Sequence, residues 1–143
     1  MKRRMIACVL LVASFTLIFS SIAYATTAIG SWRNVPNGRA RATVQAVPSR
    51  QIRATVQFQA NRDIPASWVR GQAMIINDRG QRVNISAWRV HPTVIRAGQT
   101  VTVQQIARVN VPLNSNWRGQ GQIWTAAPSV ITTMPQTPFV RAR

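Results

Sequence analysis

The sequence predicts an all-β protein, a single antiparallel β-sandwich of about seven strands that follows a cleaved N-terminal signal peptide. Three observations support this prediction. Apolar and polar residues alternate with a period of two rather than 3.6. Turn-forming residues recur at intervals of about 8 to 12 positions, a spacing typical of sandwiches. After a 25-residue leader, 118 of the 143 residues remain, which suits one domain.

The leader has the three parts of a secretory signal peptide. Basic residues occupy positions 2–4, an apolar run extends from 5 to about 19, and a small-x-small sequence covers 23–25. We therefore expect cleavage after Ala25 and export to the periplasm, the cell surface or the extracellular space. The uncharged stretch 5–25 is almost long enough to span a bilayer, so retention as a membrane anchor is the alternative.

The charge of the chain is strongly one-sided. The whole sequence has 18 Lys and Arg, two acidic residues and a formal net charge of +16. Beyond residue 25 the basic residues are fifteen arginines and the acids are two aspartates, a net charge of +13. The only cysteine, Cys8, belongs to the leader, so the exported chain must be stabilised by a core and not by disulfides.

We expect a flexible N-terminal segment at 26–38 and a β-sandwich domain at 39–143. The first two strands of the domain are the clearest. Apolar residues occupy every second position from Ala40 to Ala46 and again from Ile52 to Ala60, with a turn around Pro48-Ser49 between them. These strands should form a hairpin that is buried on one face.

Five further strands follow from turn and proline signals. Turns are expected at Asn77-Asp78-Arg79-Gly80 and at Ala97-Gly98-Gln99, and Pro92 and Pro112 should end the strands before them. Gln105 interrupts an otherwise apolar face and predicts a β-bulge. The expected strands are 67–77, 81–90, 100–111, 119–126 and a short one at 138–143.

The order of these signals resembles that of a known class of modules. Asn77-Asp78-Arg79-Gly80, Ala97-Gly98-Gln99-Thr100 before a long strand, Val111-Pro112, and a glycine before an aromatic strand occur in this order. The pattern is similar to bacterial immunoglobulin-like and fibronectin type III-like β-sandwich modules, including the bacterial cell-adhesion-related domain. The tyrosine usual in their penultimate strand is missing from Gly121-Gln122-Ile123-Trp124. The resemblance covers roughly 53–127 and implies an immunoglobulin-like sandwich with an adhesion, matrix or accessory role.

The composition argues against catalysis and against a metal site. Acid–base chemistry needs positioned groups with tunable pKa values, and the exported chain offers only His91, Asp63 and Asp78. Both aspartates lie at predicted turns, and no nucleophile motif accompanies the histidine. One histidine and two aspartates also fall short of the usual metal-ligand sets. We expect no enzyme activity, no catalytic residue, no metal and no cofactor.

Arginines at strand positions predict a surface for anionic ligands. Their planar guanidinium groups match phosphate, sulfate and carboxylate through paired hydrogen bonds. Strand parity turns six of them toward solvent, and these are the candidate polyanion-binding residues: Arg39, Arg41, Arg53, Arg70, Arg82 and Arg108. The expected partner is lipopolysaccharide, an acidic polysaccharide or extracellular nucleic acid, without sequence-specific recognition. The alternative is that arginine is simply the solubilising charge of this protein.

Five tryptophans follow the leader, and their positions suggest different roles. Trp68 and Trp124 are expected in the core. Trp88, by its parity, and Trp117, by its polar surroundings, are candidate aromatic contacts for a partner.

The hypothesis that follows is a secreted, non-enzymatic β-sandwich with a binding or structural role at the cell surface or in the extracellular matrix. A subunit of a surface filament or pilus is the alternative, in which 26–38 would add as a strand to a neighbouring copy. A membrane-active cationic protein is a third reading, disfavoured because the chain has no basic amphipathic helix.

Overall fold

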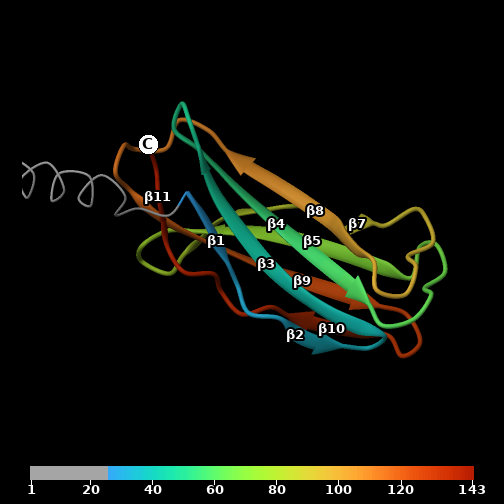
Figure 1. Cartoon of the computed structure of the whole chain (residues 1–143). Coiled ribbons are helices and arrows are strands. Elements are labelled where there is room, and N and C mark those ends of the chain that lie inside the picture. The colour runs from blue at the N-terminus through green and yellow to red at the C-terminus, as the bar shows by residue number, and fades with distance from the viewer. Residues whose placement is uncertain (1–25) are drawn as a thin grey trace, which may run out of the picture.

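The computed structural model describes residues 26–143, so the predicted signal peptide and its cleavage site lie outside the described residues. Residues 26–143 form eleven strands in two antiparallel sheets that face one another (Figure 1). This part of the chain contains no helix of the length and hydropathy that a membrane crossing requires. The prediction of an all-β antiparallel sandwich is confirmed.

The first sheet has the strand order β1-β3-β4-β8, and β2 pairs with a second stretch of β3. Its strands are β1 (Thr27–Ile29), β2 (Arg33–Val35), β3 (Gly38–Val47), β4 (Gln51–Ala60) and β8 (Thr100–Arg108). The hairpin of β3 and β4 is the longest pairing in the molecule, with ten Cα partners from Gly38↔Ala60 to Val47↔Gln51. It forms because two period-two segments of equal length flank a short turn at 48–50.

The second sheet has the order β10-β9-β5-β6, with β11 added to β9 and β7 added to β5. Its strands are β5 (Val69–Ile76), β6 (Arg82–Ile85), β7 (Arg89–Val90), β9 (Asn116–Thr125), β10 (Val130–Thr133) and β11 (Val140–Arg141). The turn between β5 and β6 is the predicted one. The side-chain oxygen of Asn77 accepts from the backbone N–H groups of Arg79 and Gln81, and Gly80 takes a φ of +77°.

The inner faces of both sheets hold unusually small residues where the sheets come closest. On β9, Gly119 and Gly121 face the first sheet, and on β5 Gly71 faces β8. A Cβ atom on Gly119 would lie 2.8 Å from the carbonyl oxygen of Thr43, and one on Gly71 would lie 2.8 Å from Cγ1 of Val103. These three glycines form the glycine waist of the sandwich, where no larger residue fits without moving the sheets apart.

Larger side chains fill the core on either side of the glycine waist. One cluster includes Phe58, Ile64, Ile95 and Ile123, and the other includes Ile52, Ile75 and Trp117. The alternation predicted for the β3–β4 hairpin is confirmed, because every second residue from Ala40 to Ala46 and from Ile52 to Ala60 is buried. Hydrophobic burial at both ends thus holds the sheets at a spacing that the glycines permit.

The segment 26–38 was predicted to be flexible, but it contains two strands, β1 and β2. β1 pairs with Thr43–Gln45 of β3, and β2 pairs with Gly38–Ala40. Ala28 and Val35 are buried in the two core clusters. Alternation over three residues is too short to recognise in a sequence, which is why these strands, and β10 in the proline-rich connection, were not predicted. The other added strand arises because 81–90 divides into β6 and β7.

The bulge predicted at Gln105 lies two residues earlier. Val56 pairs with Gln104 and Gln57 pairs with Thr102, so Val103 is the extra residue of β8. A bulge reverses the in–out parity of the residues that follow it. Ala107 and Val109, expected in the core, are therefore exposed, and β8 ends at Arg108 rather than at 111.

The glycine waist yields a stability prediction for Gly121→Ala. The added methyl group would collide with Cγ2 of Val56 and lie 2.9 Å from the carbonyl oxygen of Gln72. We expect a loss of about 1–3 kcal/mol in the free energy of unfolding, measured by chemical denaturation. Val56→Ala in the same background should recover part of this loss. Independent, additive effects of the two substitutions would contradict the close approach.

Candidate functional site

The outward face of the first sheet carries a regular set of arginine and glutamine pairs. Arg39 lies opposite Gln59 and Arg41 lies opposite Gln57 across the β3–β4 hairpin. In each pair the Nε of the arginine donates to the Oε1 of the glutamine, over 2.6 Å for Arg39 and 2.9 Å for Arg41. The hairpin register therefore places both arginines on one face of the sheet.

Trp32, which precedes β2, completes this arrangement. Its ring lies 4.5 Å from the guanidinium carbon of Arg39 and 4.2 Å from that of Arg41. Together with Gln57 and Gln59 these residues form what we call the Trp32 face. Because each glutamine oxygen accepts from the Nε of its arginine, the terminal amino groups of both arginines are left for other partners. The sequence did not identify Trp32 as part of this face, because only the pairing of β2 with β3 brings it beside Arg39 and Arg41.

The six arginines predicted to bind polyanions do not share one surface. Arg53 lies on the same outward face as Arg39 and Arg41, opposite Gln45 at the other end of the hairpin. Arg70 and Arg82 belong to the second sheet, on β5 and β6, and both are exposed. The predicted set is thus divided between two faces of the sandwich.

Arg108 was wrongly predicted to face solvent. The bulge at Val103 turns it toward the space between the sheets, where it is half-buried. Its Nη1 donates to Oδ1 of Asn84 over 2.6 Å, and its guanidinium lies 5.7 Å from the centre of the Trp117 ring. Arg108 therefore joins β8 to the second sheet and is a structural residue.

Trp117 was also wrongly predicted as an exposed aromatic contact. β9 begins three residues earlier than expected, so Trp117 is an inward residue with 6% of its surface exposed. Its indole N–H donates to the hydroxyl of Ser115 over 2.7 Å, which satisfies its one polar group. Trp68, expected in the core, is half-buried against the first core cluster.

The second sheet has a shallow hollow of about 230 Å³ on its outward face, lined by Arg70, Trp88, Trp124 and Ile131. Trp124 was expected in the core and is instead half-buried here, because its parity on β9 is opposite to that of Ile123. The guanidinium carbon of Arg70 lies 4.6 Å from the centre of the Trp124 ring. Trp88, a predicted contact residue, is 39% exposed at this hollow.

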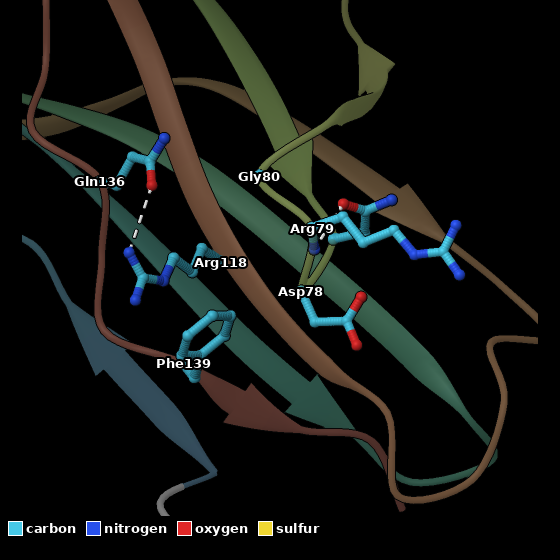
Figure 2. Close-up of a pocket in the computed structure, with 7 residues that line it drawn as sticks. Asp78, Arg79, Gly80, Arg118, Gln136 and Phe139 are labelled. Atoms are coloured by element: carbon cyan, nitrogen blue, oxygen red, sulfur yellow. Dashed lines mark hydrogen bonds between the residues drawn. The ribbon is translucent and has the colours of Figure 1, made fainter.

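A second hollow of about 390 Å³ lies beside the turn between β5 and β6, and Arg118, Gln136 and Phe139 line its other side (Figure 2). The guanidinium carbon of Arg118 lies 3.8 Å from the centre of the Phe139 ring, and its Nη1 donates to Gln136 over 3.3 Å. The carboxylate of Asp78 also lines this hollow. Its negative charge makes the hollow a poorer site for an anion than the two faces described above.

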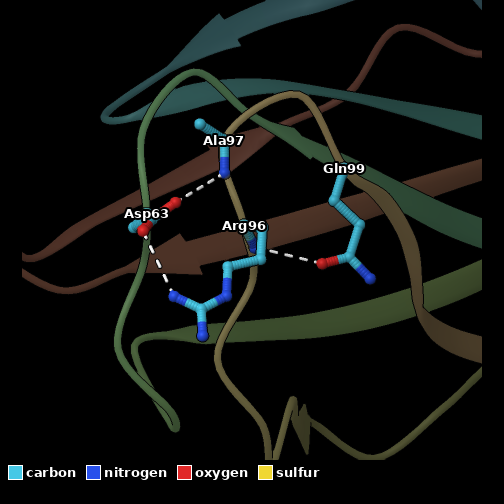
Figure 3. Close-up of polar contacts among 4 residues, drawn as sticks. All are labelled: Asp63, Arg96, Ala97 and Gln99. Atoms are coloured by element: carbon cyan, nitrogen blue, oxygen red, sulfur yellow. Dashed lines mark hydrogen bonds and ion pairs between the residues drawn. The ribbon is translucent and has the colours of Figure 1, made fainter.

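Asp63 is used to fasten two loops together. Its Oδ1 accepts from the backbone N–H of Ala97 over 2.9 Å and its Oδ2 pairs with Nη1 of Arg96 at 3.3 Å, while Gln99 accepts from the N–H of Arg96 (Figure 3). We call these four residues the Asp63 latch. The Ala97 N–H and then the Arg96 guanidinium lower the pKa of the Asp63 carboxyl below its usual value. Among the described residues this is the only ion pair found between an arginine and an aspartate.

Within the described part of the chain, the His91 side chain makes no hydrogen bond to Asp63 or Asp78. Its backbone N–H donates to Val69, and its side-chain Nε2 is buried without a hydrogen-bond partner. Burial of the ring, and then the charge of Arg89, lower the pKa of His91. No group of three metal-ligating side chains occurs within the described part of the chain.

Fold and surface together define the class: an antiparallel β-sandwich with an arginine-rich exterior. Neither the family models nor the curated proteins contain a match to the chain. Among solved structures, the chain is similar to the C-terminal domain of Wzt, with 12% identity, a TM-score of 0.45 and coverage of 80% of this chain and 81% of that one. It is also similar to an endonuclease/exonuclease/phosphatase from Beutenbergia cavernae DSM 12333, with 14% identity, a TM-score of 0.32 and coverage of 74% and 27%. Both TM-scores are below 0.5.

The different positions of Arg108 and Arg53 yield a stability prediction. Arg108→Ala removes a charged hydrogen bond and the contact with Trp117, and should lower the free energy of unfolding by about 1.5–3 kcal/mol. Arg53→Ala removes the same charge from the outward face, and we expect a change within about 0.5 kcal/mol. Denaturant titration of both variants measures the difference. Equal losses would mean that Arg108 has no structural role.

The Asp63 latch predicts a pH-dependent contribution to stability. Because its pKa is lower in the folded state than in the unfolded state, the latch stabilises the fold above about pH 4 and loses this effect as the pH falls through the folded pKa. Asp63→Asn should therefore lower the melting temperature at pH 7, and the difference from wild type should shrink near pH 3.

Asp78→Asn is the matched control for this experiment, since it removes the same charge from an exposed turn without touching the latch. An equal loss of melting temperature in both variants would assign the effect to net charge alone.

Proposed function

We propose that this chain is an exported, non-enzymatic β-sandwich that binds an anionic polymer at the cell surface or in the extracellular matrix. The observation that carries the proposal is the Trp32 face, where one ring and two glutamine oxygens hold the guanidinium groups of Arg39 and Arg41. Oriented guanidinium groups lose less side-chain entropy when a ligand binds. Their terminal amino groups match sulfate, phosphate or carboxylate.

The surrounding charge supports this proposal. The described residues carry fifteen arginines and two aspartates, and the single ion pair lies in the Asp63 latch, outside the Trp32 face. A positive surface without carboxylates concentrates polyanions near it and speeds their association. A polar strip continues the face toward Arg53. It consists of Thr43 and Thr55, which hydrogen-bond to each other, and of exposed Gln45.

An acidic polysaccharide or lipopolysaccharide fits this face better than a nucleic acid does. Proteins that bind single strands stack successive bases on several aromatic side chains. The Trp32 face has one such ring, and two guanidinium groups already lie over it. Extracellular nucleic acid therefore remains a partner through its phosphates only, without sequence recognition.

The finer points of the proposal rest on the sequence. Export follows from the leader, and the absence of catalysis follows from a chain with one histidine, two aspartates and no other acid, cysteine or lysine beyond residue 25. The resemblance to immunoglobulin-like and fibronectin type III-like modules supports an adhesion or matrix role. Assembly into a filament by strand addition is less favoured, because β1 and β2 already pair with β3 of their own chain.

Retention on immobilised heparin across a salt series tests the proposed function. We expect elution well above about 0.15 M salt, because each ionic contact releases counterions and binding falls steeply as salt rises. The double variant Arg39→Gln/Arg41→Gln should elute earlier, and the slope of log K against log salt should fall by about 2.

Arg79→Gln/Arg89→Gln is the matched control, because both residues are exposed, Arg79 in the β5–β6 turn and Arg89 on β7 of the second sheet, and the loss of charge is the same. It should change the slope by less than half as much. Elution of wild type below about 0.15 M salt, or equal effects of the two double variants, would mean that the arginines only keep the protein soluble. Columns carrying DNA or lipopolysaccharide then rank the polymers.

A further inference from the structure

The hollow on the second sheet is built from one cross-strand row of side chains. Arg70 on β5 pairs with Trp124 on β9, which pairs with Ile131 on β10, and Val90 on β7 lies on the other side of Arg70. Trp88, just before β7, closes the hollow. Four segments of the chain therefore meet here, and the site exists only in the folded sheet.

The hollow combines apolar rings with a positive charge that has no acidic partner. Ile131 is 59% exposed and Trp88 is 39% exposed, so apolar surface is left open to solvent. The indole N–H of Trp124 already donates to the hydroxyl of Ser129 over 2.9 Å, so its ring contributes mainly apolar contact. Arg70 is exposed, and no carboxylate lines the hollow.

The next row of the sheet adds hydrogen-bond acceptors. Gln72 on β5 lies opposite Gln122 on β9, which lies opposite Thr133 on β10. Both glutamines use their amide N–H groups within the protein, one to the Ser86 carbonyl over 3.0 Å and one to the Thr133 hydroxyl over 3.0 Å. Their carbonyl oxygens are left to accept from hydroxyl groups of a ligand.

We infer that this hollow binds one carboxylated sugar ring, a hexuronate unit of an acidic polysaccharide. The C–H face of a pyranose packs on the exposed ring of Trp88 and on Ile131. Its carboxylate pairs with Arg70, which lies over the Trp124 ring, and its hydroxyl groups donate to Gln72 and Gln122. At about 230 Å³ the hollow is smaller than a drug-sized pocket and suits a single ring. A cationic ligand is disfavoured because Arg70 would repel it.

The inference rests on the proposed function for the presence of an acidic polysaccharide, but it concerns a different sheet from the Trp32 face. The two faces have distinct tasks. The Trp32 face offers two guanidinium groups to the charge of a polymer, whereas the hollow recognises the shape and charge of one sugar unit. A monosaccharide therefore tests the hollow without the polymer.

The experiment titrates the protein with methyl glucuronide and with methyl glucoside, followed by tryptophan fluorescence and by saturation transfer to the ligand protons. We expect a Kd of about 1–10 mM for the glucuronide and binding about tenfold weaker for the neutral glucoside. Arg70→Gln should lower the affinity for the glucuronide to that for the glucoside. Trp88→Ala should weaken both ligands together.

The controls lie on the opposite sheet. Arg39→Gln/Arg41→Gln should leave glucuronide binding unchanged while it lowers heparin retention, so failure of the hollow and failure of the proposed function are distinguishable. Equal affinity for both sugars, unchanged binding in Arg70→Gln or Trp88→Ala, or no saturation transfer at about 50 mM sugar would each overturn the inference.

Discussion

The close approach of the two sheets at Gly71, Gly119 and Gly121 is the constraint on which the rest of the molecule depends. Small residues at the waist bring β9 within contact of β3 and β4, and large aliphatic and aromatic residues then fill both ends. A core made in this way uses nearly every inward position for an apolar side chain. Because desolvating an unpaired guanidinium is costly, most arginines are exposed, and the inward, half-buried Arg108 has Asn84 as its hydrogen-bond partner.

Aromatic rings decide how those arginines are oriented. Five guanidinium groups lie over rings: Arg39 and Arg41 over Trp32, Arg70 over Trp124, Arg108 over Trp117 and Arg118 over Phe139. Each such contact contributes about 0.5–1 kcal/mol at an exposed site, which offsets part of the repulsion among fifteen like charges. Lysine lacks the planar group that stacks in this way, so the choice of arginine has a structural reason beyond charge.

How far the sequence could predict this structure depends on the range of the interactions involved. Alternation over ten residues identified β3 and β4 and the outward direction of Arg39 and Arg41, because local parity is sufficient there. The same alternation predicted the wrong direction for the Arg108 side chain, because one extra residue in β8 reverses the parity of every strand residue after it.

Predictions for the tryptophans were wrong for a related reason. The start of β9, and with it the burial of Trp117, depends on backbone hydrogen bonds from Asn114 to Ala142 and from Ala142 to Ser115. Those partners lie almost thirty residues apart, and no local pattern contains them. The same holds for Trp32, whose neighbours come from β3.

Arg96 differs from Arg39, Arg41 and Arg70 in the kind of group that holds its guanidinium. Arg96 has a carboxylate partner and a fixed structural task in the Asp63 latch. Arg39, Arg41 and Arg70 are held equally well, but by a ring or an amide oxygen, which leaves their charge unneutralised. A solubilising charge gains nothing from being held in one orientation, whereas a binding charge does, because the entropy of ordering it has been lost before the ligand arrives. Their orientation without neutralisation is therefore the feature that favours a ligand over solubility.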